Sequence, residues 1–125
     1  MLTGARFGTS DIKRAIAFYD AVAGTLGASR VMDRPGMAAY RGPNGGMFII
    51  GTPRDGEANV GNGSQVMFAA QDSAAVDKAY STAIDLGGTC EGPPGSRGSA
   101  EMQLYAAYFR DPDGNKIMVM HSGAG

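Results

Sequence analysis

Four polar side chains of this 125-residue chain could orient a bound molecule, and the last three could also take part in catalysis: Gln65, Arg6, Tyr108 and Lys116. A Lys or Tyr that is removed from water can act as a general acid or base, and a cationic side chain attracts an anionic or carbonyl group. Proton transfer requires that such groups meet, and no spacing in the sequence brings any two of them together. They are therefore candidates for ligand binding first and for catalysis second.

Cys90 and His121 are the single cysteine and the single histidine. A lone thiol forms no disulfide within the chain, which is typical of a reducing cytoplasm, and no base stands near Cys90 in the sequence to activate it. His121 ends the last apolar run and is out of phase with Met118. We expect a structural or incidental role for Cys90 and a surface or interface position for His121.

Composition excludes several classes of protein. Apolar residues make up 43% of the chain and the formal net charge is -1, with no run of Lys or Arg that would bind a phosphate backbone. No apolar stretch approaches the ~20 residues that a bilayer requires, and no signal-peptide pattern is present. We expect one cytoplasmic domain over residues 1–125, with neither nucleic acid nor membrane as partner.

The chain contains an internal repeat. The string from Phe7 to Asp11 precedes a helical pattern, and the similar string from Phe68 to Asp72 precedes another about 61 residues later. The turn at residues 40–45 leads into an apolar run, and the turn at residues 109–114 does so about 69 residues later. The similar strings occur in the same order and at nearly the same sequence offset, which indicates that one structural unit occurs twice in the chain.

The two units are placed as module one at residues 1–52, a polar linker at residues 53–63 and module two at residues 64–121. Each module reads as a strand, a helix and three strands. The extra residues of the second copy fall in residues 91–100, a Gly-, Pro- and Ser-rich segment that is predicted to be a loop.

Two helices are predicted from apolar residues at three- and four-residue steps. The first face comprises Ile12, Ala15, Ile16, Tyr19, Val22 and Leu26, and the second comprises Val76, Ala79, Tyr80 and Ala83. Capping residues bound both patterns: Ser10 or Asp11 and Gly27 for the first, Asp72 or Ser73 and Gly87 for the second. Strands are predicted near residues 4–9, 29–33, 37–41, 46–51, 64–70, 88–91, 102–110 and 115–121.

Alternation along the strands divides their side chains between two faces. Phe7 and Phe68, with the apolar residues in phase with them, are expected to pack under the helices. The opposite face is apolar and rich in methionine, so it is either core or a subunit interface, or it lines a ligand cup. The candidate lining residues are Arg6, Met47, Gln65, Met67, Tyr108, Lys116 and Met118.

The doubled unit resembles the vicinal oxygen chelate superfamily, the group of glyoxalases, bleomycin-resistance proteins and dioxygenases. The resemblance covers roughly residues 1–121. It depends on Ser10-Asp11 before a helix with Ala17-Phe18-Tyr19, on Ala75-Val76 followed by Gly87-Gly88, and above all on the string from Tyr105 to Ile117 with its Asp111-Pro112-Asp113-Gly114 turn. It implies an α+β fold in which two βαβββ modules form a curved mixed sheet.

The resemblance also implies where a metal would be bound. Active members use His on the first strand and Glu on the last strand of each module, and these positions fall here on Gly4, Ile49, Gln65 and Met118. Gly and Ile have no donor atom, a thioether suits Mg, Mn and Fe(II) poorly, and a Gln oxygen is weak. We therefore expect neither a metal nor another cofactor.

Metal-free members of this superfamily include bleomycin-resistance proteins, which sequester a drug in the cup, commonly as dimers. By this similarity we expect metal-independent binding of a small molecule by a homodimer. Arg6 and Lys116 favour an anionic or carbonyl-bearing ligand. The alternatives are an enzyme with a variant site, similar to a lactoylglutathione lyase or a dioxygenase, and an interaction protein whose Met-rich face closes a dimer.

Overall fold

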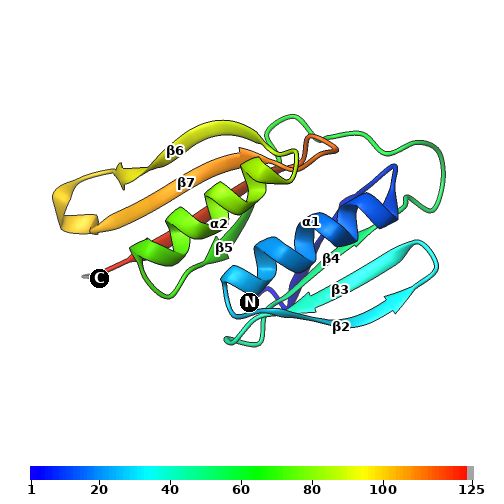
Figure 1. Cartoon of the computed structure of the whole chain (residues 1–125), viewed down its shortest axis with the longest axis horizontal. Coiled ribbons are helices and arrows are strands. Elements are labelled where there is room, and N and C mark those ends of the chain that lie inside the picture. Colours follow the sequence, from blue (N-terminus) through cyan, green and yellow to red (C-terminus); the bar gives the residue numbers. More distant parts are fainter. Residues whose placement is uncertain (124–125) are drawn as a thin grey trace.

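The computed structural model describes residues 1–123 as two helices and eight strands with one short 3-10 helix (Figure 1). In chain order these are β1 (Gly4–Gly8), α1 (Ile12–Thr25), β2 (Ser29–Arg34), β3 (Met37–Arg41), β4 (Met47–Gly51), β5 (Val66–Ala69), α2 (Ser73–Asp85), β6 (Thr89–Arg97), η1 (Ala100–Met102), β7 (Leu104–Arg110) and β8 (Lys116–Ser122). The order is β, α, β, β, β twice, an α+β arrangement as predicted. Neither helix is long and apolar enough to cross a bilayer.

The strands form two four-stranded mixed sheets, ordered β1-β4-β3-β2 and β5-β8-β7-β6. In each sheet the first strand runs parallel to the last strand of its unit, and the other neighbours are antiparallel. The registers also repeat, as two matched sets of neighbours show: Ala5–Phe48 with Val66–Ile117, and Ala38–Ile50 with Ala107–Val119. Corresponding residues in the two sets differ by the same 61 and 69 positions as the sequence repeat. The sequence repeat is therefore also a repeat of structure.

Both helices begin and end at residues that the sequence marks. The carboxylate of Asp11 accepts a hydrogen bond from the backbone N–H of Arg14 at 3.1 Å, and Asp72 accepts one from Ala75 at 2.8 Å. These bonds satisfy N–H groups that have no partner within the helix. Gly27, with φ of 76°, turns the chain after α1 in the left-handed region that glycine adopts without strain.

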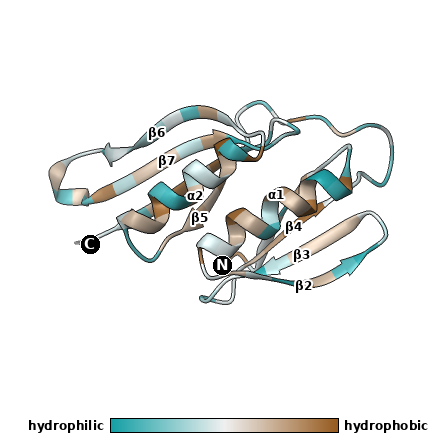
Figure 2. Cartoon of the chain, viewed as in Figure 1, coloured by the Kyte–Doolittle hydropathy of each residue, from teal (hydrophilic) through white to brown (hydrophobic). Residues whose placement is uncertain are grey.

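Both helices lie on the same side of the two sheets, and the core lies between (Figure 1). It crosses from one unit to the other, because the rings of Phe48 and Phe68 are 5.2 Å apart and those of Phe18 and Phe109 are 6.2 Å apart. The strand residues assigned to the helix side lie in or against this core: Phe7, Phe48, Ile50, Phe68, Phe109, Ile117 and Val119. In Figure 2, β3 is hydrophobic while β2 beside it becomes hydrophilic toward its end.

The prediction of a loop over residues 91–100 was wrong. β6 continues to Arg97 and pairs with β7 through two irregularities, with Gly95 opposite Ala106 and Arg97 opposite Leu104. The segment contains Pro93 and Pro94, which lack the N–H that an inner strand must donate. β6 lies at the edge of its sheet, where bulged prolines are tolerated.

Candidate functional site

The open face is the side of each sheet that is turned away from the helices, and the strand registers define its members. In the second sheet, Met67, Met118 and Tyr108 are neighbours across β5, β8 and β7. In the first sheet, Arg6 lies beside Ile49, and Gly4 lies beside Met47. The candidate residues of the strands therefore occupy the open face of their own sheets, and Gln65 directly precedes β5.

Met67, Met118 and Tyr108 form an apolar row with a cationic border. The Met67 side chain is 62% exposed, whereas Met118 beside it is 5% exposed. The ammonium of Lys116 lies 5.4 Å from the centre of the Tyr108 ring. A cation over an aromatic ring is attracted to it while remaining accessible to an anion. The row thus offers an apolar surface, formed mainly by Met67 and the Tyr108 ring, with the positive charge of Lys116 beside it.

The side chains of Arg6 and Met47 make their contacts at opposite ends of β4. The guanidinium of Arg6 donates a hydrogen bond of 2.9 Å to the carbonyl of Thr52, directly after β4. The sulfur of Met47 accepts one of 3.2 Å from Arg41 on β3. The two side chains therefore do not meet, and no pair formed by Arg6 with Tyr108 or Lys116 is present among the described contacts.

A cavity of about 390 Å³ lies between the first sheet, β5 and α1, with Tyr19, Ala23 and Leu26 of α1 in its wall. This volume is within the range of small-molecule pockets. Its walls are mostly apolar and include three of the predicted lining residues, Met47, Gln65 and Met67. Arg6, Tyr108, Lys116 and Met118 are outside it. The described structure thus divides the predicted site into this cavity and the Tyr108 row.

The four positions that correspond to the family's metal ligands do not fit a metal ion. Gly4 and Ile49 provide no donor atom, and the Met118 sulfur is buried between Met67 and Tyr108. Gln65 alone provides an oxygen. Among residues 1–123, no three His, Cys, Asp or Glu side chains come together as a metal site. A catalytic zinc requires about three protein ligands, so these residues support no metal-dependent step.

Arg97 belongs to this face and was missed by the sequence analysis. Its guanidinium carbon lies 5.8 Å from the centre of the Tyr108 ring, and it donates hydrogen bonds to the carbonyls of Pro93 and Ser96. The position was assigned to a loop, so no alternation applied to it. The polar residues Ser96 and Arg97, after the two prolines, could have indicated that the strand continues beyond them.

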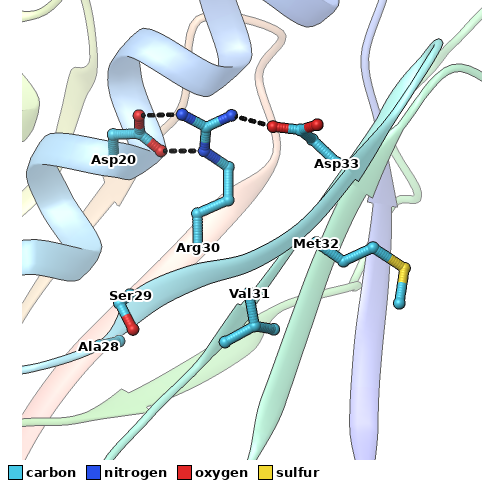
Figure 3. Close-up of a pocket in the computed structure, with 7 residues that line it drawn as sticks. All are labelled: Asp20, Ala28, Ser29, Arg30, Val31, Met32 and Asp33. Carbon is cyan, nitrogen blue, oxygen red and sulfur yellow. Dashed lines mark hydrogen bonds and ion pairs between the residues drawn. The ribbon is translucent and has the colours of Figure 1, made fainter.

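A second, more polar cavity lies on the outer side of β2, where Figure 3 shows the guanidinium of Arg30 between two carboxylates. Arg30 is ion-paired to Asp20, with its Nε 3.1 Å from a carboxylate oxygen, and also to Asp33. The charges of this cavity are therefore satisfied within the protein. None of the predicted site residues lines it.

A buried polar cluster joins the two units behind the sheets. The hydroxyl of Tyr19 on α1 donates a hydrogen bond of 2.6 Å to Asp111, which also accepts one of 2.9 Å from the side chain of Asn115. The same Asn115 amide donates to the carbonyl of Gly8 at 2.9 Å. Burial raises the pKa of Tyr19 well above its ordinary value, and the Asp111 carboxylate raises it further. Tyr19 is thus a fixed donor.

His121 lies on the helix side, as its phase relative to Met118 predicted. It is opposite Tyr105, whose hydroxyl bonds to Asp77 on α2, and its Nδ1 is 3.2 Å from the carbonyl of Ala70. Its Nε2 is buried without a partner among the described residues. Cys90 is exposed on β6. Neither side chain is a neighbour of the Tyr108 row.

Known structures resemble this chain over nearly its whole length. A crystal structure of a glyoxalase/bleomycin resistance protein from Albidiferax ferrireducens T118 is 43% identical, with a TM-score of 0.89, and the match covers 97% of this chain and 98% of that one. A glyoxalase-related enzyme from Fulvimarina pelagi is 16% identical, with a TM-score of 0.75, over 96% of this chain and 86% of that one. A comparison with curated proteins gives no match.

A lactoylglutathione lyase from Agrobacterium tumefaciens shares the fold at 22% identity, with a TM-score of 0.69 over 96% of this chain and 92% of that one. The family model for the Glyoxalase/Bleomycin resistance protein/Dioxygenase superfamily matches residues 5–119. The repeated βαβββ unit, its register and this match agree with the resemblance found in the sequence. The chain belongs to the glyoxalase/bleomycin resistance protein/dioxygenase superfamily.

Proposed function

We propose that this chain binds a small molecule on the open face of its sheets without a metal ion. The observation that carries the proposal is the row of Met67, Met118 and Tyr108, which occupies the floor of the second sheet with thioethers and an aromatic ring. Such groups bind apolar ligands of varied shape but do not hold a hard cation. Met67 also lines the cavity of about 390 Å³, which extends from there to α1 and is large enough for a ligand of drug or metabolite size.

The proposal includes a homodimer in which a second copy covers the open face. β1 and β5 each hydrogen-bond to a single strand, so both have a free edge. Met67 and Met32, which lies beside Ala39 on the open face, are 62% and 41% exposed. Each of these large apolar side chains is exposed on the open face of its own sheet, and such exposure often marks a contact with a ligand or a subunit. The exposed single thiol of Cys90 supports action in the reducing cytoplasm.

A thermal-shift screen of aromatic drugs and metabolites tests the binding function. We expect ligands that raise the melting temperature, with an unchanged shift after treatment with a chelator. The variant Met67→Asp, at an exposed position, is expected to remove the shift. Leu86→Asp is the matched control, since Leu86 is also exposed, at 42%, but follows α2 on the helix side. A shift that appears only after metal is added contradicts the proposal.

Light scattering during size-exclusion chromatography tests the assembly. The expected mass is twice the 12.9 kDa of one chain. Ligand binding should weaken as the protein is diluted into the range where the dimer dissociates. A chain that is monomeric at concentrations where it binds ligand fully would rule out the dimer and leave the binding function standing.

A further inference from the structure

The open faces carry positive charges that no carboxylate neutralises. By strand register, Arg6, Arg34 and Arg41 lie on the open face of the first sheet, and Arg97 and Lys116 lie on that of the second. None of these five side chains forms an ion pair within residues 1–123. In a protein with a formal net charge of -1, this is a segregation of charge rather than an excess of basic residues.

The acidic residues of the strands are already paired. Asp33 lies on the helix side, where it binds Arg30. Glu91 binds Arg110, with a carboxylate oxygen 2.5 Å from its Nε. No other Asp or Glu occurs in the eight strands. The open faces therefore have a positive potential that the strands themselves leave unbalanced, and such a surface concentrates anions.

Tyr108 lies between two of these cations along β7, since Arg97 is opposite Leu104 and Lys116 is opposite Arg110. The Arg97 guanidinium carbon and the Lys116 ammonium lie 5.8 Å and 5.4 Å from the centre of its ring. Each side of the ring thus carries a positive charge without a carboxylate partner, and a bound anion would neutralise part of it. The hydrogen bonds of Arg97 to the carbonyls of Pro93 and Ser96 hold its guanidinium in place before a ligand arrives.

Two glycines of β6 make room for the Arg97 guanidinium. A Cβ at Gly95 would lie 2.9 Å from a terminal nitrogen of Arg97, and one at Gly92 would lie 3.3 Å from the other and 3.3 Å from the Tyr108 ring. Neither glycine has a positive φ, so the backbone does not require glycine at these positions. Glycine within a strand weakens it and often marks a close approach, which here is the approach of a cation.

The first sheet repeats this arrangement. A Cβ at Gly51 would lie 2.8 Å from a terminal nitrogen of Arg6, and Gly51 also lacks a positive φ. The guanidinium of Arg6 thus lies over Gly51 while it bonds to the Thr52 carbonyl. In both sheets a guanidinium lies flat against the open face over a residue without a side chain.

We propose that the ligand of the open face is an organic anion, whose apolar body contacts the exposed Met67 and the Tyr108 ring and whose charged group is bound by the cations on either side of that ring, Arg97 and Lys116. The inference rests on the proposed binding function and adds the chemical class of its ligand. A neutral carbonyl compound would leave both cations unbalanced, whereas a carboxylate, sulfonate or phosphate forms charge-assisted hydrogen bonds with them.

Two fluorescent probes with the same rings test this class. Anilinonaphthalene sulfonate is an aromatic anion, and phenylnaphthylamine has the same ring system without the sulfonate. We expect the anion to bind about tenfold more tightly at low salt, as one charge-assisted hydrogen bond provides. Added salt should weaken binding of the anionic probe but not of the neutral one, because salt screens only the charge.

Variants locate the charge. Lys116→Met and Arg97→Gln should each weaken anion binding about tenfold and leave the neutral probe unchanged. Gly95→Ala keeps every charge but displaces the Arg97 guanidinium, so it should also weaken binding of the anionic probe. Lys78→Met is the matched control, because Lys78 is exposed on α2. Unchanged near-ultraviolet circular dichroism and melting temperature confirm that each variant is folded.

The outcomes separate the two proposals. Equal binding of both probes, unaffected by Lys116→Met and Arg97→Gln, overturns the anion class while the binding function stands. Binding of neither probe overturns both. Displacement of the anion by heparin with an affinity that grows with heparin length overturns the small-ligand proposal, because the face would then be a polyanion surface.

Discussion

The hydroxyl of Tyr19 lies 2.6 Å from a carboxylate oxygen of Asp111, although the two residues are 92 positions apart. The bond connects α1 of the first unit to the turn between β7 and β8 of the second. Both side chains are buried, with Tyr19 1% and Asp111 3% exposed. The Asp111-to-Gly114 turn, which carries the family resemblance in the sequence, is thus also a tertiary contact between the two units, called the interunit contact below.

Tyr19→Phe should destabilise the protein by about 2 kcal/mol, because the variant leaves a buried carboxylate with one partner fewer. Urea unfolding followed by circular dichroism measures this. Tyr40→Phe is the control: its hydroxyl bonds at 2.8 Å to Asp20, whose side chain is 41% exposed and can bind water instead. We expect less than about 1 kcal/mol there. Equal losses of unfolding free energy in both variants would argue against a special role for the Tyr19–Asp111 contact.

Asp113 in the same turn adds to the interunit contact through its bonds to Ser10 and Arg14. Its carboxyl should make the free energy of unfolding depend on pH in acid. Burial raises the pKa of this carboxyl, but hydrogen bonds from Ser10 and Thr9 and the nearby Arg14 outweigh it, so the pKa lies below its ordinary value. Its contribution to stability is complete above the pKa of the carboxyl in the unfolded chain, about 3.9, and is lost as the pH falls through the lower folded value.

Asp113→Asn should therefore lower the free energy of unfolding at neutral pH by about 1 to 2 kcal/mol and lower it much less in strong acid. Urea titrations across this pH range give both quantities. Asp85→Asn is the control, since Asp85 is exposed at the end of α2 and has no hydrogen bond or ion pair among the described residues. A constant difference between Asp113→Asn and the parent protein at every pH would contradict the assignment.

The fold was largely predictable because its information is local and repeated. Apolar periodicity and capping residues such as Asp11 and Asp72 located the helices, and the two offsets of the repeat predicted a doubled unit, which the matching strand registers of the two sheets confirm. The path of β6 was not predictable in this way. Pro93 and Pro94 have loop propensity, and only their place at the sheet edge makes a strand compatible with them.

The candidate site was predictable only in part, because its contacts are not local. Alternation assigned Tyr108 and Lys116 to one face, but the cation–ring contacts also require Arg97, which the loop assignment hid. The bonds of Asp113 to Ser10 span 103 residues, and no local pattern encodes them. The turn was correctly predicted as a turn, whereas its tertiary role needed the arrangement of both units.

Two glycine-to-alanine substitutions should have opposite effects on stability. Gly24 lies in α1, and a Cβ there would meet nothing within 4 Å, so Gly24→Ala should stabilise by about 0.5 to 1 kcal/mol through helix propensity. A Cβ at Gly51 would lie 3.0 Å from the carbonyl of Gly36 as well as against Arg6. Gly51→Ala should cost about 1 to 3 kcal/mol through overpacking. Thermal unfolding of both variants checks this, and stabilisation by Gly51→Ala would show that the strand shifts freely.

A metal site introduced on the open face tests whether missing donors explain the mismatch with the family's ligand set. Gly4→His is unsuitable, because a Cβ at Gly4 would lie 2.9 Å from the carbonyl oxygen of Met47. Gln65→His with Met67→His places two imidazoles on one face at alternate positions, and Met118→Glu adds a carboxylate beside them. These are ligands that zinc accepts.

The triple variant should gain about 2.7 kcal/mol of stability in zinc at a hundredfold excess over its dissociation constant, and the parent protein should gain none. Unfolding with and without zinc measures the gain. A second triple variant, Gln65→Asn with Met67→Gln and Met118→Gln, keeps similar volumes and lacks the ionisable donors. Zinc that leaves the first variant unchanged would mean that these three side chains do not share a face, and the Met67, Met118 and Tyr108 row would then lose its support.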